Sequence, residues 1–463
     1  MTVKNPSDER LRGLLGGLSP AARALIAKGI KARPATDTAS EPAAAPATVA
    51  APPPGPVAAD LQRALGKAFF EPIVPFINAP KLLHREPGRI AEDAVDQVWN
   101  WLCRDFARDA VAAALVGHPD RAALTARATA LRQGVLPLIA ATLGSIGEAP
   151  IAQQRLSAQI GADRSYRDLA AIESAFRQIG WVMPIMRRMP RVLTRREMED
   201  DPGLIAPIEV ALLSPQGEPA WLFSALLPQL ETPTLLARIA VALAGTDSAE
   251  SIARSPAASA IDILLSEVEL EVARLRDARS DRRPGAGGLA AAELAIQRYH
   301  AVLRELEAII DVGPGSRWGA RIAVVKKVAT AEVAPEIGEA GGLVRRVFRQ
   351  KSSLGEALAV DADLVEDADR ALHFLKAASN ARESFALNAV VASVSREVEQ
   401  AFEVLIDPLL QELRRSFGEA KARASARAEA ALRLAETYFG TAYAATMRRS
   451  VHVASEEKSR LRG

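Results

Sequence analysis

The chain has 463 residues, enough for roughly two or three domains, and 49% of them are hydrophobic, which supports apolar cores. Only 5% are aromatic and alanine is abundant, so helices are favoured over sheets. With 58 lysines and arginines against 56 aspartates and glutamates, the net charge of +2 provides no global field for nucleic acid.

Residues 1–31 are predicted to form a short helical segment. Ser7 provides a capping hydroxyl for a leucine-rich helix, and Ser19 with Pro20 begins a second helix. Residues 32–59 are mostly alanine and proline and cannot bury a core, so a disordered linker is predicted. A helical segment on such an arm indicates either a tethered docking element or a frayed tail. The leucines of the first helix are Leu11, Leu14, Leu15 and Leu18.

The second of these helices begins with Ser19-Pro20-Ala21-Ala22-Arg23. This pentapeptide resembles the opening of the peripheral subunit-binding domain of dehydrogenase acyltransferases. The glycine-rich turn that follows in that family is absent, because Pro34 and the linker come instead. We therefore assign the chain to no family.

Residues 60–250 are predicted to form an irregular helical domain. Its first apolar positions run from Leu61 to Ile73, and prolines at 72, 75 and 80 then bend the chain. Pro87 opens a longer helix, in which Cys103 is expected to be a small buried residue. As the only cysteine, Cys103 excludes an intramolecular disulfide and indicates a reducing compartment. Shorter helices are predicted at 121–133, 152–161, 167–181, 204–213, 219–230 and 233–244.

Residues 181–196 of this domain combine tryptophan, methionines and arginines. Such a surface suits an acidic protein partner or an anionic membrane. Pro184 and Pro190 are expected to prevent one regular helix. Acidic residues follow from 197 to 201, so core methionines with solvated arginines are the favoured alternative. The candidate contact residues are Trp181, Met183, Met186, Arg187, Arg188 and Arg191.

Residues 251–450 are predicted to form a bundle of long helices. Between 255 and 315, apolar residues recur every three or four positions in two arms, separated by the glycine-rich stretch 284–288. The glutamates at 267, 269 and 271 are interpreted as ordinary surface charge. Because the loop is long, a register of the two arms shifted by one heptad is an open alternative. The expected layers pair Leu275 with Ala292, Val272 with Ile296, Val268 with Tyr299, Leu265 with Leu303, and Ile261 with Leu306.

The remaining sequence continues this pattern. Residues 318–333 suit either a helix or a short strand, and residues 387–405 form a third apolar seam. Asp407-Pro408 is expected to kink or restart that helix. A last helix is predicted from Glu419 to about Arg449, and residues 451–463 are predicted to form a disordered tail.

A second basic cluster lies between residues 317 and 351. Its apolar residues alternate with arginines, which suits a membrane or an acidic protein, although a solvated charged face is the commoner meaning of such a run. Nucleic acid is disfavoured because few aromatic residues accompany the charge. The candidate contact residues of this cluster are Arg345, Arg346, Phe348 and Arg349.

The sequence offers no recognisable catalytic, cofactor or metal site. Walker A, His-Glu-x-x-His, Gly-x-Ser-x-Gly and Cys-x-x-Cys motifs are absent, and the five histidines are scattered. Residues 285–290 match a loose dinucleotide fingerprint, but a charged helix is predicted before them where that motif needs a strand. We expect no catalytic residues, no cofactor and no metal.

We predict an all-α protein with an N-terminal irregular helical domain, followed by an elongated antiparallel helical bundle with coiled-coil-like seams. The leading function is a non-catalytic adaptor or scaffold that assembles with itself or with protein partners through these seams. The alternative is a peripheral membrane-associated protein that binds anionic surfaces through the basic-apolar patches, and an enzyme of unrecognised class is third. No apolar run approaches the ~18 residues that span a bilayer. The N-terminus carries charges between Asp8 and Arg12 and lacks the apolar core of a signal peptide, so no signal peptide is expected. A bacterial cytoplasmic location is expected, with the periphery of the inner membrane as the alternative.

Overall fold

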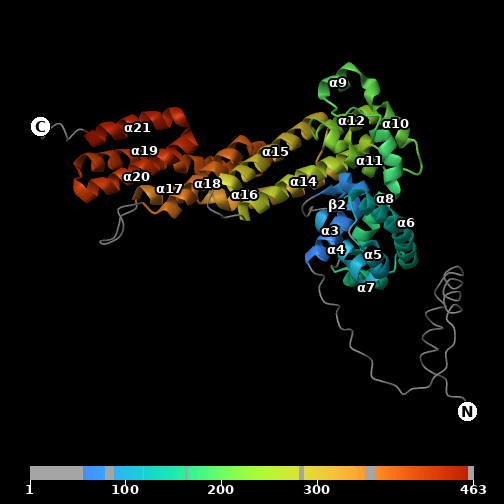
Figure 1. Ribbon diagram of the computed structural model, residues 1–463. Helices are drawn as coiled ribbons and strands as arrows, with labels where there is room; N and C mark the ends of the chain where they lie inside the picture. Colours follow the sequence, from blue (N-terminus) through green and yellow to red (C-terminus); the bar gives the residue numbers. More distant parts are fainter. Residues whose placement is uncertain are drawn as a thin grey trace, which may run out of the picture. The chain divides into compact units, whose positions relative to one another are not determined.

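The computed structural model describes residues 56–78, 88–117, 119–161, 165–280, 286–349 and 360–456. Over these ranges the predicted all-α class is confirmed (Figure 1). The only sheet in these ranges is a two-residue parallel pair, β1 (Ile77–Asn78) with β2 (Ile90–Ala91). The predicted helical segment 1–31 and the linker as far as residue 55 lie outside the described residues. Residues 56–59, predicted as linker, instead belong to a helix that begins at Pro56. None of the described helices has the length and apolar character needed to cross a membrane.

Contacts between Cα atoms divide the chain into two units. Unit 1 comprises Met1–Glu71 and Asp96–Glu173, and unit 2 comprises Pro72–Val95 and Ser174–Gly463. Unit 1 is therefore formed from two separate stretches of chain, and the segment between them belongs to unit 2. These bounds differ from the contiguous ranges 60–250 and 251–450, which stay a prediction for independently folding domains.

Unit 1 is organised around the packing of α3 against α6. The Asp120 carboxylate caps α6 by accepting from the Ala123 amide at 2.7 Å. Arg132 of α6 donates to the carbonyls of Ala68 and Phe69, at 2.6 and 2.9 Å, and so binds the last turn of α3. The helices in this part of the chain are α3 (Pro56–Phe70), α4 (Glu92–Trp101), the π-turn η2 (Leu102–Phe106), α5 (Arg108–Ala114), α6 (Arg121–Ile146), α7 (Pro150–Ile160) and α8 (Ser165–Met186), of which α4 and α8 cross a unit boundary.

Cys103 is half-buried in unit 1. Burial raises the pKa of its thiol to about 11, and a hydrogen bond with Gln62 opposes the shift only partly. The thiol therefore stays protonated at neutral pH, although Cys103 is less buried than expected.

Unit 2 begins with short helices that surround apolar side chains such as Trp221 and Phe223. Phe76, from the separate segment of this unit, contacts Trp221 edge-on with ring centroids 4.8 Å apart. The short elements are η1 (Glu71–Phe76), which begins one residue before the unit boundary, α9 (Arg195–Asp200), η3 (Pro202–Ile205), α10 (Ala206–Leu212), α11 (Pro219–Leu226), η4 (Leu227–Gln229), α12 (Leu235–Ala244) and α13 (Ala249–Ala253).

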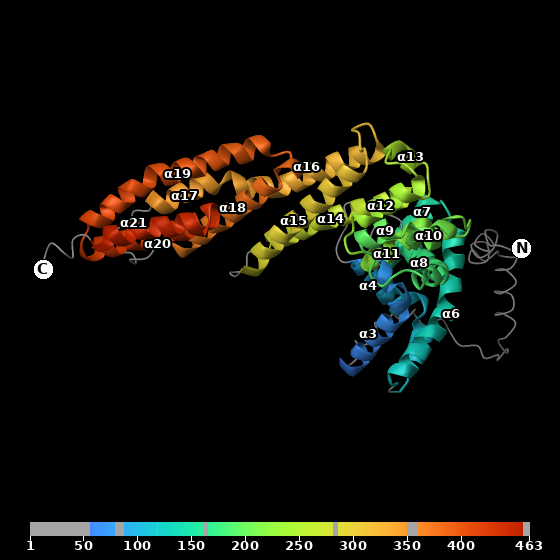
Figure 2. The ribbon, with the colours of Figure 1, turned by 90° about the horizontal axis from the view of Figure 1, so that it is seen from above.

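Longer helices follow in unit 2, and α19, α20 and α21 lie side by side (Figures 1 and 2). A turn at Gly440, with φ of +91°, divides the single last helix that we expected into α20 and α21. Helix α21 also continues through Glu456, beyond the expected start of the tail. The bounds are α14 (Ala258–Ser280), α15 (Ala286–Ile309), α16 (Arg317–Gly338), α17 (Ala340–Arg349), α18 (Ala362–Asn380), η5 (Arg382–Ser384), α19 (Asn388–Arg415), α20 (Gly418–Phe439) and α21 (Thr441–Glu456).

The predicted helical hairpin corresponds to α14 and α15, which lie side by side in both views (Figures 1 and 2). Ser255 Oγ accepts from the Ala257 amide at 3.2 Å, just before the first residue of α14. All the apolar residues named above for the five layers are buried, while their pairwise register stays a prediction. Helix α14 also packs against α11, α12 and α16, so the hairpin is only part of its environment.

The structure decides several expectations about local structure. Residues 318–333 form a helix throughout, so the strand alternative is excluded. Residues 181–196 do not form one helix, as expected, because α8 ends at Met186, although Pro184 itself lies within α8. Pro408 lies within α19, so the expected restart of that helix is wrong. The glutamates at 269 and 271 are buried rather than part of the surface, because α14 has neighbours on more than one face.

Candidate functional site

The first candidate surface surrounds the end of α8. Met186 and Met189 are buried in the core, and Met183 is half-buried. Trp181 is also half-buried and lies against Gly217, where a Cβ atom would overlap its indole ring. The tryptophan and methionines are therefore engaged within the chain, as in the interpretation favoured from the sequence.

The arginines at this surface point outward. Arg187, Arg188 and Arg191 are exposed, and no carboxylate in the described part of the chain pairs with them. Val192 beside them is 56% exposed. These four residues are called the arginine surface below.

The acidic residues that follow neutralise other arginines instead. Within α9, Arg195 pairs with Glu199 at 2.7 Å and Arg196 with Asp200 at 3.5 Å. Glu197 completes a capping box with Thr194, and these hydrogen bonds hold the pKa of its carboxyl below its ordinary value. The expected local neutralisation therefore applies to Arg195 and Arg196, and it leaves the arginine surface charged.

The second candidate cluster lies on α17, and the structure does not unite its residues on one face. Phe348 is buried and contacts Phe402 edge-on, with ring centroids 5.2 Å apart. Arg345 pairs with Glu397 at 3.0 Å, while Arg346 and Arg349 are exposed. This helix therefore presents its apolar residues to the core, which leaves no basic-apolar surface of the kind predicted.

A cluster of charged residues that the sequence analysis missed lies between α14 and α16. Glu269 is 0% exposed, and its carboxylate accepts from Arg321 Nε at 2.7 Å. Asp262 accepts from the indole N–H of Trp318 at 2.9 Å and also pairs with Arg317. Ionised side chains at such depth need partners, because desolvation strongly disfavours an isolated charge. We call Asp262, Glu269, Trp318 and Arg321 the buried charge cluster, and the exposed Arg317 lies beside it.

A spacing in the sequence could have revealed this cluster. Asp262 and Glu269 are seven residues apart on α14, and Arg317 and Arg321 are four apart on α16, so each pair shares one helix face. The sequence does not indicate that these two faces meet, since more than fifty residues separate them. Glu267 on the same helix has a different partner, the buried guanidinium of Arg89, whose pKa burial lowers.

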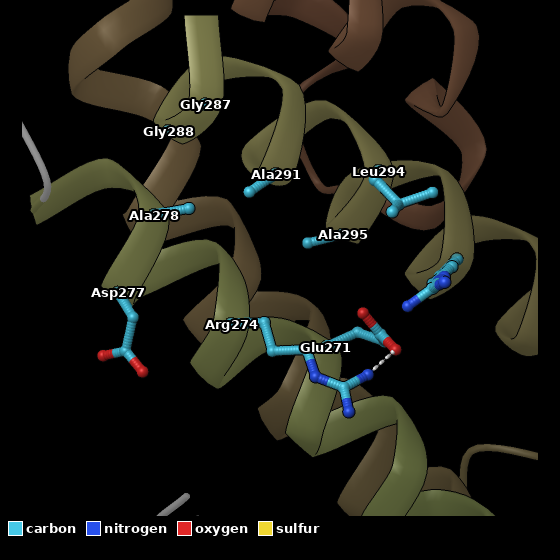
Figure 3. A pocket seen from close by; sticks show the side chains of 10 residues that line it. Glu271, Arg274, Asp277, Ala278, Gly287, Gly288, Ala291, Leu294 and Ala295 are labelled. Carbon is cyan, nitrogen blue, oxygen red and sulfur yellow. Dashed lines mark hydrogen bonds and ion pairs between the residues drawn. The ribbon is translucent and has the colours of Figure 1, made fainter. Parts of the chain in front are cut away.

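A pocket of about 480 Å³ lies near the tip of the hairpin, between the C-terminal part of α14 and the N-terminal half of α15 (Figure 3). Small side chains, Ala278, Ala291 and Ala295, form its wall, while the side chain of Asp277 points away from α15. The pocket is lined by residues of both arms, some between 271 and 278 and others between 287 and 298, in agreement with antiparallel arms.

Glu271 lies at the inner end of this tip pocket. Its Oε1 accepts from Arg274 at 2.5 Å, and its Oε2 is buried without a hydrogen-bond partner among the described residues. Burial raises the pKa of this carboxyl, although Arg274 and Arg298 oppose the shift. Since Oε2 is enclosed by protein, a ligand in the pocket has no direct access to it.

A larger cavity, of about 650 Å³, lies in unit 1 between α5 and α6. Its floor contains the small exposed residues Ala110, Ala113, Ala130 and Gly134. Leu138 at one end is 57% exposed. We call this feature the α5–α6 groove.

The described residues include no group of three or more His, Cys, Asp and Glu side chains placed to hold a metal ion. The histidines seen in the structure lie apart, with His300 against Ser384 and His373 against Glu293. The loose dinucleotide fingerprint begins at residue 285, outside the described residues, and α15 starts at Ala286. No known protein family, curated protein or solved structure matches this chain.

Proposed function

We propose that this chain is a non-catalytic helical adaptor or scaffold, which binds a protein partner with acidic residues through the arginine surface. The observation that carries the proposal is that Arg187, Arg188 and Arg191 are exposed without a carboxylate partner in the described chain, whereas Arg195 and Arg196 are paired. A guanidinium group binds a carboxylate through two parallel hydrogen bonds, and a cluster of guanidinium groups attracts acidic surfaces.

This proposal differs from assembly through the long seams. The residues of the hairpin seam are buried, and so are Val391, Val394 and Val398 of the third seam. Since helices of the same chain cover them, these residues offer no apolar stripe to another protein. A partner therefore has to bind elsewhere, and the arginine surface is the most strongly charged place available near the end of α8.

An anionic membrane is the alternative partner, and the contacts of the aromatic residues speak against it. Trp181 rests on Gly217, and Phe348 is buried against Phe402. Neither of these aromatic side chains protrudes as an interfacial anchor does. A cytoplasmic location fits the single cysteine and the proposed protein partner.

The test is quantitative affinity purification of the tagged full chain. The variant Arg187→Gln/Arg188→Gln/Arg191→Gln should lose an acidic partner that the wild type recovers, and recovery by the wild type should fall as salt rises. The matched control is Arg195→Gln/Arg196→Gln, which removes two arginines that are already paired and should keep the partner. Equal recovery by all three proteins would contradict the proposal.

Vesicles containing anionic phospholipid provide the second arm of the test. The proposal expects no co-sedimentation of the wild type at physiological salt. Co-sedimentation that the triple variant abolishes would instead support a peripheral membrane protein and overturn the acidic protein partner.

A further inference from the structure

Three aromatic side chains meet at the turn between α20 and α21, beside α19. The rings of Phe439 and Tyr443 lie 4.4 Å apart between their centroids, and Tyr438 contacts Phe439 edge-on at 4.8 Å. Phe439 also contacts the buried Phe402 of α19, so the aromatic group is anchored to the core. Tyr443 is 39% exposed, which leaves part of its ring available to another molecule.

Two exposed glutamates of α19 border these rings. The hydroxyl of Tyr438 donates to Glu399 at 3.4 Å. Burial raises the pKa of Tyr443, and the charge of the nearby Glu403 raises it further. Aromatic faces and carboxylates therefore lie together on the outside of unit 2. We call Glu399, Glu403, Tyr438 and Tyr443 the tyrosine–glutamate surface.

No lysine or arginine in the described part of the chain forms an ion pair with either of these glutamates. Basic residues of the neighbouring turns have other partners. Arg396 of α19 donates to the carbonyl of Ala392, and Arg448 of α21 pairs with Glu436 at 3.5 Å. The two carboxylates are therefore open to a cation from another molecule.

This combination of groups favours arginine among cationic side chains. A planar guanidinium group stacks on a tyrosine ring and also binds a carboxylate through two parallel hydrogen bonds. The ammonium group of lysine is a compact point charge without this planar geometry. The tyrosine–glutamate surface is thus complementary to a cluster of exposed arginines.

The arginine surface of the same chain provides such a cluster. Arg187, Arg188 and Arg191 are exposed and have no carboxylate partner among the described residues, and Val192 beside them is 56% exposed. Each copy of the chain therefore carries both members of a complementary pair of surfaces. Since no ion pair joins the two surfaces within the described chain, their groups are free to pair between copies.

We propose that the tyrosine–glutamate surface of one copy binds the arginine surface of a second copy. This inference rests on the proposed function, because it names the acidic partner of the arginine surface. The contact joins two unlike surfaces, so repetition of it forms a closed ring or an open chain of copies. The scaffold then assembles with itself through charged surfaces rather than through its buried seams.

Sedimentation velocity of the full chain over roughly 1–100 μM, where contacts of a few side chains become measurable, tests this proposal. The wild type should form species larger than one chain as its concentration rises, and added salt should weaken their formation. Glu399→Gln/Glu403→Gln should weaken the association by about tenfold or more, because the arginines lose their carboxylates. Association of this variant equal to that of the wild type would overturn the proposal.

A matched control removes two other carboxylates from the same helix. Glu397 and Glu412 of α19 already pair with Arg345 and Arg427, so they are not available to a second copy. Glu397→Gln/Glu412→Gln should therefore associate as the wild type does. An equal loss in this control and in Glu399→Gln/Glu403→Gln would show that the effect follows from net charge alone and would overturn the proposal.

A mixture of two variants tests the pairing of the surfaces directly. Glu399→Gln/Glu403→Gln keeps its arginine surface, and the triple variant Arg187→Gln/Arg188→Gln/Arg191→Gln keeps its tyrosine–glutamate surface. At a concentration at which each variant alone is monomeric, an equimolar mixture should form a complex of two chains and no larger species. Such a complex also shows that both variants are folded. A mixture that stays monomeric while the wild type associates would overturn the proposal.

Substitutions of Tyr443 separate stacking from charge. Tyr443→Leu removes the aromatic face and should weaken the association by about two- to fivefold, as loss of an exposed cation–π contact does. Tyr443→Phe keeps the face and should associate as the wild type does. Unchanged association of Tyr443→Leu would overturn the role assigned to the tyrosine ring.

Failure of this inference is distinguishable from failure of the proposed function. A wild type that stays monomeric, yet recovers an acidic protein that the triple arginine variant loses, overturns only the second copy as the partner. Recovery of a basic protein that Glu399→Gln/Glu403→Gln loses, from a wild type that stays monomeric, also overturns this inference and assigns the surface to a different protein. A monomeric wild type whose recovered proteins are unchanged in the triple arginine variant overturns both proposals.

Discussion

Glu269 shows how a single side chain on α14 depends on its partner across the helix interface. Its carboxylate is completely buried and accepts from Arg321 at 2.7 Å. Removal of one member of a buried pair leaves the other charge without compensation. Charge alone therefore does not mark a residue of this helix as exposed.

The resulting prediction concerns the free energy of unfolding. Glu269→Ala should reduce it by at most about 3–5 kcal/mol, because the largely buried Arg321 loses this carboxylate and keeps Asp262 at 3.9 Å. The matched control, Asp277→Ala, removes an exposed carboxylate from the same helix and should change it by less than about 0.5 kcal/mol. Denaturant unfolding of both variants measures this difference. Equal losses in the free energy of unfolding would contradict the burial of Glu269.

Glu271 leads to a prediction about pH. Burial raises the pKa of its carboxyl above that of an unfolded glutamate, so the folded state binds the proton more tightly. Above the folded pKa, the wild type holds a buried charge, and Glu271→Gln should be the more stable protein. Below the unfolded pKa both states of the wild type are neutral at this position, and the advantage should vanish.

The melting temperatures of the wild type and Glu271→Gln, compared at about pH 8 and about pH 4, measure this effect. At each pH, the difference between the two proteins reports on this one carboxyl. A stability advantage of Glu271→Gln that increases as the pH falls would contradict this prediction. The half-exposed contact with Arg274, which the variant weakens, contributes only about 0–1 kcal/mol.

At the scale of elements, the hairpin α14–α15 depends on its apolar seam. Leu265→Ala should reduce the free energy of unfolding by about 2–5 kcal/mol, since this leucine is fully buried. Leu294→Ala makes the same chemical change on a side chain that is 45% exposed, and its effect should be clearly smaller. Similar losses from both substitutions in chemical denaturation would show that the seam does not stabilise this unit.

The sequence predicted the elements better than their surroundings. Apolar spacing identified the hairpin and the seam 387–405, because a helix that buries one stripe repeats its apolar residues every three or four positions. The buried charge cluster escaped because its partners lie on different helices. Phe348 was placed at a surface because a run of arginines around it conceals which face of α17 is buried.

The prolines inside helices also show that the sequence does not reveal the surroundings of an element. A proline inside a helix leaves the carbonyl four residues earlier without its donor. In α8 and α19 the prolines at 184 and 408 are exposed, and so are Gly180 and Val404, whose carbonyls lose their donors. Water can hydrate these carbonyls, so both helices continue. Whether a proline ends a helix thus depends on exposure, which the sequence alone does not state.

At the scale of the whole molecule, the interrupted order of unit 1 leads to a prediction about fragments. Residues 72–95 lie between its two stretches but contribute Phe76 to the apolar core of unit 2. A fragment of residues 56–173 should therefore expose Ile73 and Phe76 and aggregate.

The same two positions provide the check on this prediction. Ile73→Ser/Phe76→Ser should increase the soluble yield of the fragment, yet lower the melting temperature of the full chain, where these side chains are buried. A fragment that is soluble without the substitutions would show that these apolar side chains find cover within unit 1.

The separation of residues 72–95 from the rest of unit 2 along the chain also matters while the protein is being synthesised. Phe76 leaves the ribosome roughly 145 residues before Trp221, so at about 5–20 residues per second it waits roughly 7–30 s for its partner. Throughout that interval the nascent chain presents Ile73 and Phe76 without the helices that later enclose them. A chaperone that holds short apolar stretches of emerging chains would find one here, and slower translation would prolong its opportunity.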